Sequence, residues 1–354
     1  MRDLLDGLAG SERRSAAAMA AASTAIAESA RIARRCRLKA AVFGPQAGLD
    51  QGPSVCDDAN AWPLESVPRA VTGEVLDVSP HILVIGKGEV EERFALTADA
   101  NAWRGAKTDP AAVKVGDHAV VRRHDSGREV ADRIWANIGR VTGTIVRRDG
   151  DTLVVDRGDG SGNQVLVIAE RASGRIQVRF PRLEPGYLID IIGVRHDDFL
   201  EGLVPATSQP AYRADHVPGP PLVNGHVPGS FSGAAIWHEQ GDEPDGLIGT
   251  AYPAVDPQNA ATTRAGRQQA ASGCVSLPYL SIGSLLRVRN DCTGLSRVLP
   301  VIGSAASARL FCDRSVICGP SPRGRIADLT LASFVELGGE LDEGNFNVTI
   351  EIEG

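Results

Sequence analysis

An internal repeat is the strongest constraint on the fold of this 354-residue chain. The sequence Val-Thr-Gly stands at 71–73 and again 70 residues later, at 141–143. The same offset relates the apolar runs at 82–85 and 152–155 and the glycine-centred triplets at 115–117 and 185–187. Three matches at one offset indicate a duplicated domain of about 65–70 residues.

Each copy has the pattern of short strands joined by tight turns. In the second copy, alternating apolar and polar residues at 142–147 and 152–156 flank Asp149 and Gly150, which together are a strong hairpin signal. This length and strand spacing are typical of small barrels of the oligonucleotide/oligosaccharide-binding (OB) type. We therefore predict two tandem OB-like barrels, at 69–136 and 137–204.

The alanine-rich start of the chain predicts a helix over 1–43, followed by a linker at 44–68. Along one stripe of this helix, residues recur at spacings of three and four, as in a thin coiled-coil seam: Met19, Ala22, Ile26, Ser29, Ala33 and Cys36. Such a seam predicts a homo-oligomer or a larger assembly. The alternative is a signal peptide, because Arg13 and Arg14 precede a run of small residues at 16–27, but acidic residues interrupt its basic leader.

Composition excludes several classes of protein. With 43% hydrophobic and 23% charged residues the chain is globular, and no run approaches the ~20 apolar residues of a membrane span. A net charge of −7 gives no general reason to expect a nucleic-acid partner. The glycine-rich stretch at 158–162 lies between strand patterns instead of opening a helix, so it predicts a turn and not a phosphate loop. We expect no cofactor.

Four of the six cysteines fall in the last third of the chain: Cys274, Cys292, Cys312 and Cys318. They suggest one or two disulfides, a zinc site or buried thiols. No Cys-x-x-Cys pair is present and no histidine follows His238, so a Cys/His zinc site would need a ligand from elsewhere, and we predict no metal. Disulfides would place the protein in an oxidising location.

A segment rich in proline and glycine at 205–230 predicts a linker before a last domain at 231–354. That domain has a strand beginning Gly-Thr-Ala-Tyr at 249–252, a Leu-Pro-Tyr loop at 277–279 and a strand at 285–290. It ends with Gly-Arg-Ile-Ala-Asp-Leu-Thr at 324–330, a helix over 331–337 and a closing strand over 346–352. These motifs resemble the double-psi β-barrel of the rare lipoprotein A family, which is related to barwins, expansins and membrane-bound lytic transglycosylase A.

The resemblance covers about a third of the chain and implies a function at the cell wall. Members act on or bind cell-wall polysaccharide, so the expected partner is peptidoglycan or another cell-wall polysaccharide. The lytic members cleave peptidoglycan glycan strands without water, with an aspartate as acid and base. Asp328 matches that aspartate, and Asp313 is a second candidate. The resemblance also makes Tyr252, Tyr279, Asn290 and Arg325 candidate contacts for a glycan. The alternative role for Asp328 is to cap the helix that follows it.

Two departures from the family pattern bear on catalysis. The family histidine falls at or beside Cys274, and the Asp-Arg-Gly-Pro motif is split into Asp-Arg at 313–314 and Gly-Pro at 319–320. Cys312 and Cys318 lie at the ends of this insertion, where a disulfide would close it. A binding groove survives such changes better than a two-residue catalytic site does.

The sequence thus predicts a mainly β, multi-domain protein of the cell envelope or extracellular space, whose last barrel binds peptidoglycan and is lytic through Asp328. The rival prediction is a non-catalytic structural component of a phage-tail-like or other envelope-associated assembly, with the barrel as a packing or glycan-binding module. For such a component a cytoplasmic location stays open.

Overall fold

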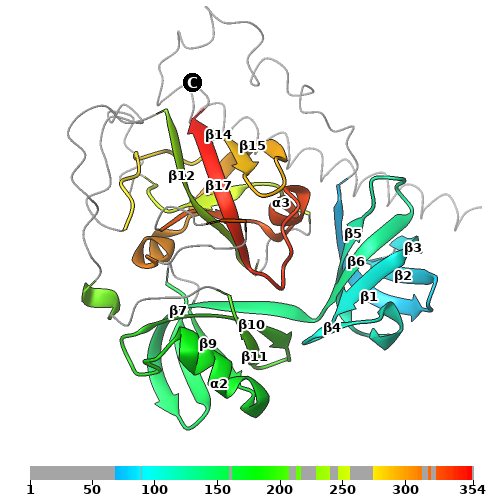
Figure 1. The fold of residues 1–354 in the computed structure, drawn as a ribbon, viewed down its shortest axis with the longest axis horizontal. Helices are drawn as coiled ribbons and strands as arrows, with labels where there is room; N and C mark the ends of the chain where they lie inside the picture. Colours follow the sequence, from blue (N-terminus) through cyan, green and yellow to red (C-terminus); the bar gives the residue numbers. More distant parts are fainter. Residues whose placement is uncertain are drawn as a thin grey trace, which may run out of the picture. The chain divides into compact units, whose positions relative to one another are not determined.

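The computed structural model describes residues 68–88, 90–158, 162–206, 213–216, 229–239, 246–255, 274–312, 318–319 and 324–352. The predicted helix at 1–43, nearly all of the linker at 44–68 and most of the linker at 205–230 lie outside these residues. Within them the protein is mainly β, with its strands in barrel-like sheets, as the sequence predicts (Figure 1). No helix in the described ranges has the length and apolarity needed to cross a membrane.

The first sheet closes on itself through a pairing between β2 and β3. Its strands follow the order β2-β1-β5-β6-β3-β4, and only β3 and β6 are parallel. The elements are β1 (Ala70–Val78), β2 (Ile82–Lys87), β3 (Val90–Trp103), β4 (Lys107–Thr108), η1 (Pro110–Ala112), β5 (His118–Arg123) and β6 (Val130–Ala136). Val75, Leu83, Ile85 and Ile134 are among the fully buried residues that fill its centre.

The second sheet is a closed barrel with the same pairing scheme. Its order is β10-β11-β9-β8-β7, again with one parallel pair, β9 with β11. The elements are β7 (Ile138–Asp149), β8 (Thr152–Asp156), β9 (Asn163–Ile168), α2 (Glu170–Arg179), β10 (Leu188–Arg195) and β11 (Leu200–Pro205). Helix α2 packs Ala172 and Ile176 into the barrel core.

The repeated glycines have the same structural cause in both barrels. A Cβ on Gly73 would lie 2.4 Å from the carbonyl oxygen of Gly86, and one on Gly143 would lie 2.0 Å from that of Asp156. Each glycine stands just before a shift in strand register, where the first two strands cross closely. Gly116, just before β5, and Gly186, just before β10, both have positive φ, at 87° and 89°. The repeated glycines in the sequence therefore arise from the same backbone requirements in the two barrels.

One residue, Asn137, joins β6 of the first sheet to β7 of the second. Among the described non-glycine residues it alone has a positive φ, 50°. Its side-chain oxygen accepts a hydrogen bond from the backbone nitrogen of His118, at 2.8 Å, and its amide donates to Asp117, at 2.7 Å. Asparagine tolerates the left-handed region better than most residues, so this junction is a fixed turn and not a loose linker.

The third sheet is a closed barrel of six strands in the order β12-β16-β13-β15-β14-β17. The pairs β12–β16 and β13–β15 are parallel, and the other pairings are antiparallel. The elements are β12 (Ser230–Trp237), β13 (Thr250–Tyr252), β14 (Leu285–Asn290), β15 (Ser296–Ser304), η3 (Ala306–Leu310), β16 (Arg325–Leu329), α3 (Leu331–Glu336) and β17 (Asn345–Ile352). A short helix, η2 (Ala214–His216), precedes this barrel.

A buried carboxylate links the second barrel to the third. Asp190 of β10 lies 2.7 Å from the guanidinium of Arg140 in β7 and 2.6 Å from that of Arg325 in β16, and all three side chains are at most 1% exposed. Thr142 donates a further hydrogen bond to Asp190. Burial alone would raise the pKa of Asp190, but the positive charges of Arg140 and Arg325 outweigh it and hold the pKa well below its usual value.

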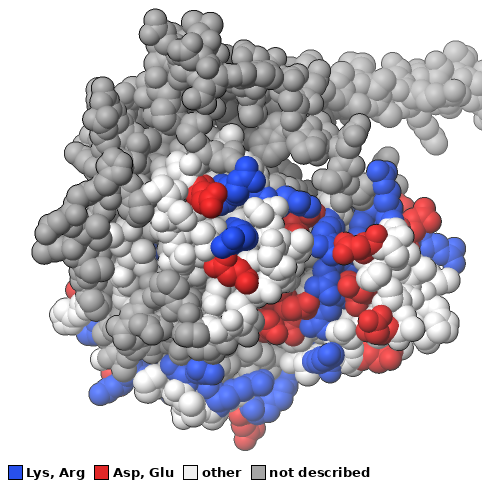
Figure 2. Space-filling model, turned by 45° about the horizontal axis from the view of Figure 1, so that its top comes forward, with Lys and Arg blue, Asp and Glu red and all other residues white. Residues whose placement is uncertain are grey.

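Ion pairs also link the first sheet to the loop between α3 and β17. Glu340 in this loop pairs with Arg122 and Arg133, and Asp342 accepts hydrogen bonds from Arg133 and from the indole of Trp135, both at 2.7 Å. Figure 2 shows basic and acidic side chains next to one another on the visible part of the described surface. Trp135 joins the apolar core that the third barrel shares with its neighbours.

We predict that Asp190→Asn lowers the free energy of unfolding by about 3–5 kcal/mol at pH 7, because two buried arginines lose their counter-charge. Urea denaturation of the full chain measures this change. Glu184→Gln is the control, because its pair with Arg182 is more than half exposed and its loss costs less than about 0.5 kcal/mol.

The effect of Asp190→Asn depends on pH. A carboxyl whose pKa is lowered by folding adds stability above its unfolded pKa, about 3.9, and loses it as the pH falls toward its folded pKa. The difference between the wild-type protein and the variant should therefore shrink below about pH 4. A difference that stays constant down to pH 2 would contradict the ionic account.

Candidate functional site

Asp328 is the least buried residue of β16 in the third barrel. Its neighbours Ala327 and Leu329 are fully buried, and so is Ile326, which lies on the same side of the strand as Asp328. The Asp328 side chain is 15% exposed, so part of it reaches solvent.

A histidine lies against this carboxylate. The ring nitrogen Nδ1 of His238 is 2.9 Å from Oδ1 of Asp328, and the His238 side chain is 24% exposed. His238 directly follows β12, which runs parallel to β16, and its backbone nitrogen donates to the carbonyl of Leu329 at 3.1 Å. Sequence reasoning missed this residue, because it sought a histidine near Cys274 and the two partners are 90 positions apart.

Asp328 does not cap the helix that follows it. The cap of α3 is Thr330, whose hydroxyl oxygen accepts a hydrogen bond from the backbone nitrogen of Ser333 at 3.2 Å. The alternative prediction of a capping role for Asp328 is therefore wrong. The Asp328 carboxylate instead lies 2.9 Å from the ring of His238, and carboxylates and imidazoles are groups that can take part in acid–base catalysis.

Small residues lie beside Asp328 across the sheet. Ala251 of β13 is its partner in the antiparallel pair, and Gly303 of β15 is the partner of Ala251 in the next pair. Residues opposite one another on neighbouring strands point to the same face. Among the described residues, a Cβ built on Gly303 would meet only Ala251, at 4.0 Å. This side of the carboxylate is thus lined by side chains too short to cover it.

Three of the four candidate glycan contacts are buried and bonded inside the protein. Tyr252 is fully buried, with its hydroxyl donating to the carbonyl of Pro278, and Asn290 is 1% exposed and donates to the carbonyl of Leu337. Arg325 belongs to the buried ion cluster with Asp190. These positions do not fit direct contact with a glycan. Tyr279 is partly exposed and packs against the core, and Asp313 lies outside the described residues.

The four cysteines of the last third form two disulfides. Cys274 pairs with Cys312 and Cys292 with Cys318, at Cα–Cα distances of 5.2 and 5.4 Å. The expected bridge between Cys312 and Cys318 is wrong, because each of them bonds to a cysteine earlier in the chain. No cluster of three or more metal-ligating side chains is found in the part of the chain that the structure describes.

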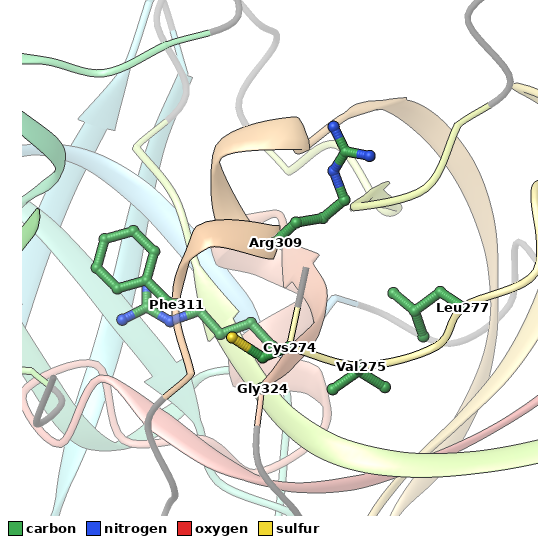
Figure 3. Close-up of a pocket in the computed structure, with 7 residues that line it drawn as sticks. Cys274, Val275, Leu277, Arg309, Phe311 and Gly324 are labelled. Carbon is green, nitrogen blue, oxygen red and sulfur yellow. The ribbon is translucent and has the colours of Figure 1, made fainter. Parts of the chain in front are cut away.

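A small pocket lies beside the first of these disulfides, with Cys274, Phe311, Gly324 and Arg325 in its lining (Figure 3). The guanidinium of Arg325 stacks 3.7 Å from the ring centre of Phe311. The space between these side chains is too narrow to admit a water molecule, so it is not a small-molecule site of the usual size. We regard it as a packing gap, and the candidate site remains the partly exposed pair of His238 and Asp328.

Comparison with known proteins identifies no relative. No protein-family model matches the chain, and no curated protein matches it. The likeness to rare lipoprotein A proteins therefore rests on the sequence motifs alone.

Two substitutions separate a structural role of the pair from a functional one. We predict that Thr330→Ala lowers the free energy of unfolding by about 1–2 kcal/mol, because α3 loses its cap. Asp328→Asn should change it by less than about 1 kcal/mol, because the side chain reaches solvent and its removal orphans no buried backbone group. Thermal or urea unfolding of the full chain measures both. A larger loss for Asp328→Asn than for Thr330→Ala would contradict this assignment.

Proposed function

We propose that the protein acts at the bacterial cell wall, where its third barrel binds peptidoglycan glycan strands and cleaves them through Asp328 and His238. The observation that carries the proposal is the hydrogen bond between these two partly exposed side chains of the third barrel. Asp328 is the position that the family motif assigns to acid–base catalysis. His238 directly follows β12, whereas the family histidine falls at or beside Cys274.

The strand pairings support the proposed relationships. The third barrel has six strands and two parallel pairs that each join strands distant in sequence, as expected of a double-psi barrel. In the first barrel β1 pairs with β2 and β5, and β3 pairs in parallel with β6. In the second barrel β7 pairs with β8 and β10, and β9 pairs in parallel with β11. When the two-residue β4 is left out, the two pairing schemes are the same. This scheme is that of OB barrels, so we propose the OB type for both.

The chemistry needs one proton donor and one acceptor. Protonated Asp328 would give its proton to the glycosidic oxygen as the bond from that oxygen to the sugar carbon breaks. A hydroxyl of the same sugar then attacks this carbon, and its proton passes to Asp328, which restores the starting state. His238, at 2.9 Å, would hold the carboxyl in position and stabilise its charged form between the two transfers.

The disulfides favour a location outside the reducing cytosol. Two bridges, Cys274–Cys312 and Cys292–Cys318, lie in the barrel that carries Asp328. Disulfides persist in oxidising compartments, so we propose the cell envelope or the extracellular space.

The contacts between barrels favour a second candidate function. The third barrel shares an apolar core and a buried ion cluster with its neighbours, so it also serves as a packing module. The second candidate is therefore a non-catalytic component of an envelope-associated assembly. Catalytic activity on sacculi distinguishes the two.

We predict that the full chain releases soluble muropeptides from purified peptidoglycan sacculi, and that Asp328→Asn lowers the rate about 10²–10⁴-fold. Because no water enters the proposed reaction, mass spectrometry should show products lighter by one water than those of hydrolysis. Asp291→Asn is the matched control, since Asp291 is an exposed carboxylate of the same barrel that bonds to Thr349 and Arg289. It should leave the rate unchanged.

Sedimentation with sacculi separates binding from cleavage. Asp328→Asn should still sediment, because binding uses the barrel surface as a whole. Release that persists in Asp328→Asn would overturn the catalytic assignment. Absence of release from the unaltered protein would favour the structural candidate.

A further inference from the structure

We infer that the second barrel positions His238 for Asp328 through Glu239, which makes Glu239 a positioning residue for the site. The consequence for catalysis rests on the proposed function. The positioning itself does not, because the orientation of a histidine ring is measurable without substrate.

Glu239 fixes the chain immediately after His238 onto the second barrel. Its carboxylate oxygen Oε1 accepts a hydrogen bond from the backbone nitrogen of Arg140 at 2.9 Å and pairs with Arg195 at 2.8 Å. Its carbonyl oxygen accepts from Arg157 at 3.2 Å. The Glu239 side chain is only 10% exposed, while the Arg195 side chain that pairs with it is 43% exposed.

The fit between Glu239 and the second barrel is close. A Cβ on Gly139 would lie 2.5 Å from Oε1 of Glu239, so a larger residue at 139 would require this carboxylate to shift. Gly139 and Arg140 are consecutive residues of β7. The start of the second barrel is thus shaped to receive a side chain of the third.

The residue before His238 is fixed as well. The indole nitrogen of Trp237 donates to the carbonyl of Leu341 at 3.0 Å, and the guanidinium of Arg140 lies 5.6 Å from the Trp237 ring centre. Both chain neighbours of His238 are therefore held, one mainly by the second barrel and one in the core of the third. Two fixed neighbours hold the backbone of His238 and thereby the point from which its ring reaches Asp328.

The charges around this segment come from two barrels. Asp328 lies on β16 of the third barrel, while Arg140, Arg157 and Arg195 belong to the second. The contacts of Glu239 are with Arg140, Arg157 and Arg195. Loss of the Glu239 side chain should therefore displace His238 by releasing the backbone next to it. A neutral residue at 239 that still accepts the hydrogen bond from Arg140 should keep His238 in place.

The test compares Glu239→Ala with Glu239→Gln in the full chain. The probe is the NMR spectrum of the ring of His238, in protein labelled at histidine and assigned with His238→Gln. In Glu239→Ala the ring signals should shift toward those seen in Asp328→Asn, where the partner carboxylate is gone. In Glu239→Gln, whose amide oxygen still accepts from the nitrogen of Arg140, they should stay near their wild-type positions. Ring signals of Glu239→Ala that coincide with wild type would overturn the inference.

A matched control excludes a general effect of losing contacts between barrels. Glu340→Gln weakens ion pairs between the third barrel and the first sheet, and it should leave the ring signals of His238 unchanged. If Glu239→Ala does not fold, Glu239→Asp keeps the charge but its shorter side chain draws the carboxylate back from the backbone nitrogen of Arg140, and it should shift the ring signals in the same direction. No shift in that variant would count against the inference.

Muropeptide release adds a second readout that separates this inference from the proposed function. Glu239→Ala should lower the rate of release about 10²-fold, with most of it restored in Glu239→Gln. Displaced ring signals in a protein that releases nothing would support the positioning and overturn the catalytic proposal. Full release by Glu239→Ala despite displaced ring signals would show that cleavage does not need His238 in place.

Discussion

The fold depends on one buried carboxylate, Asp190, and on the two arginines that neutralise it. An ionised carboxyl without partners could not remain in the protein interior, and neither could Arg140 or Arg325. Asp190 and Arg140 belong to the second barrel and Arg325 belongs to the third, so Arg325 receives a buried counter-charge across the junction of the two barrels. The burial of Arg325 is therefore coupled to the contact between these barrels.

The same ion cluster organises both halves of the candidate site. Arg325 is the first residue of β16, and Asp328 follows three positions later on that short strand. Arg140 lies over the ring of Trp237 and donates its backbone nitrogen to Glu239, so it contacts both neighbours of His238. Contacts made to stabilise the junction of two barrels therefore also determine where an acid and its histidine partner meet.

The sequence predicted the features that depend on local constraints. The repeat was visible because Gly73 and Gly143 stand where a side chain would strike the neighbouring strand, and the mainly β class followed from alternation and turns. Asp328 was found because it lies in a specific motif. These signals need only a few neighbouring residues.

Features that depend on distant parts of the chain were not predictable. His238 meets Asp328, 90 positions away, because β12 and β16 pair in parallel. Arg325 can be buried because it pairs with Asp190, which lies 135 positions earlier in the chain. An arginine in a motif is ordinarily expected at the surface, so it was predicted to contact a glycan. Likewise, spacing places cysteines in one region but leaves their connectivity undetermined.

The central claim is that Asp328 and His238 form the reacting centre for a glycan strand. A crystal structure of the full Asp328→Asn chain with a bound peptidoglycan oligosaccharide tests it most directly. The account predicts a glycosidic oxygen within about 3 Å of the residue 328 side chain, over the face formed by Ala251 and Gly303. An oligosaccharide bound on another face, with no sugar oxygen near residue 328, would contradict it.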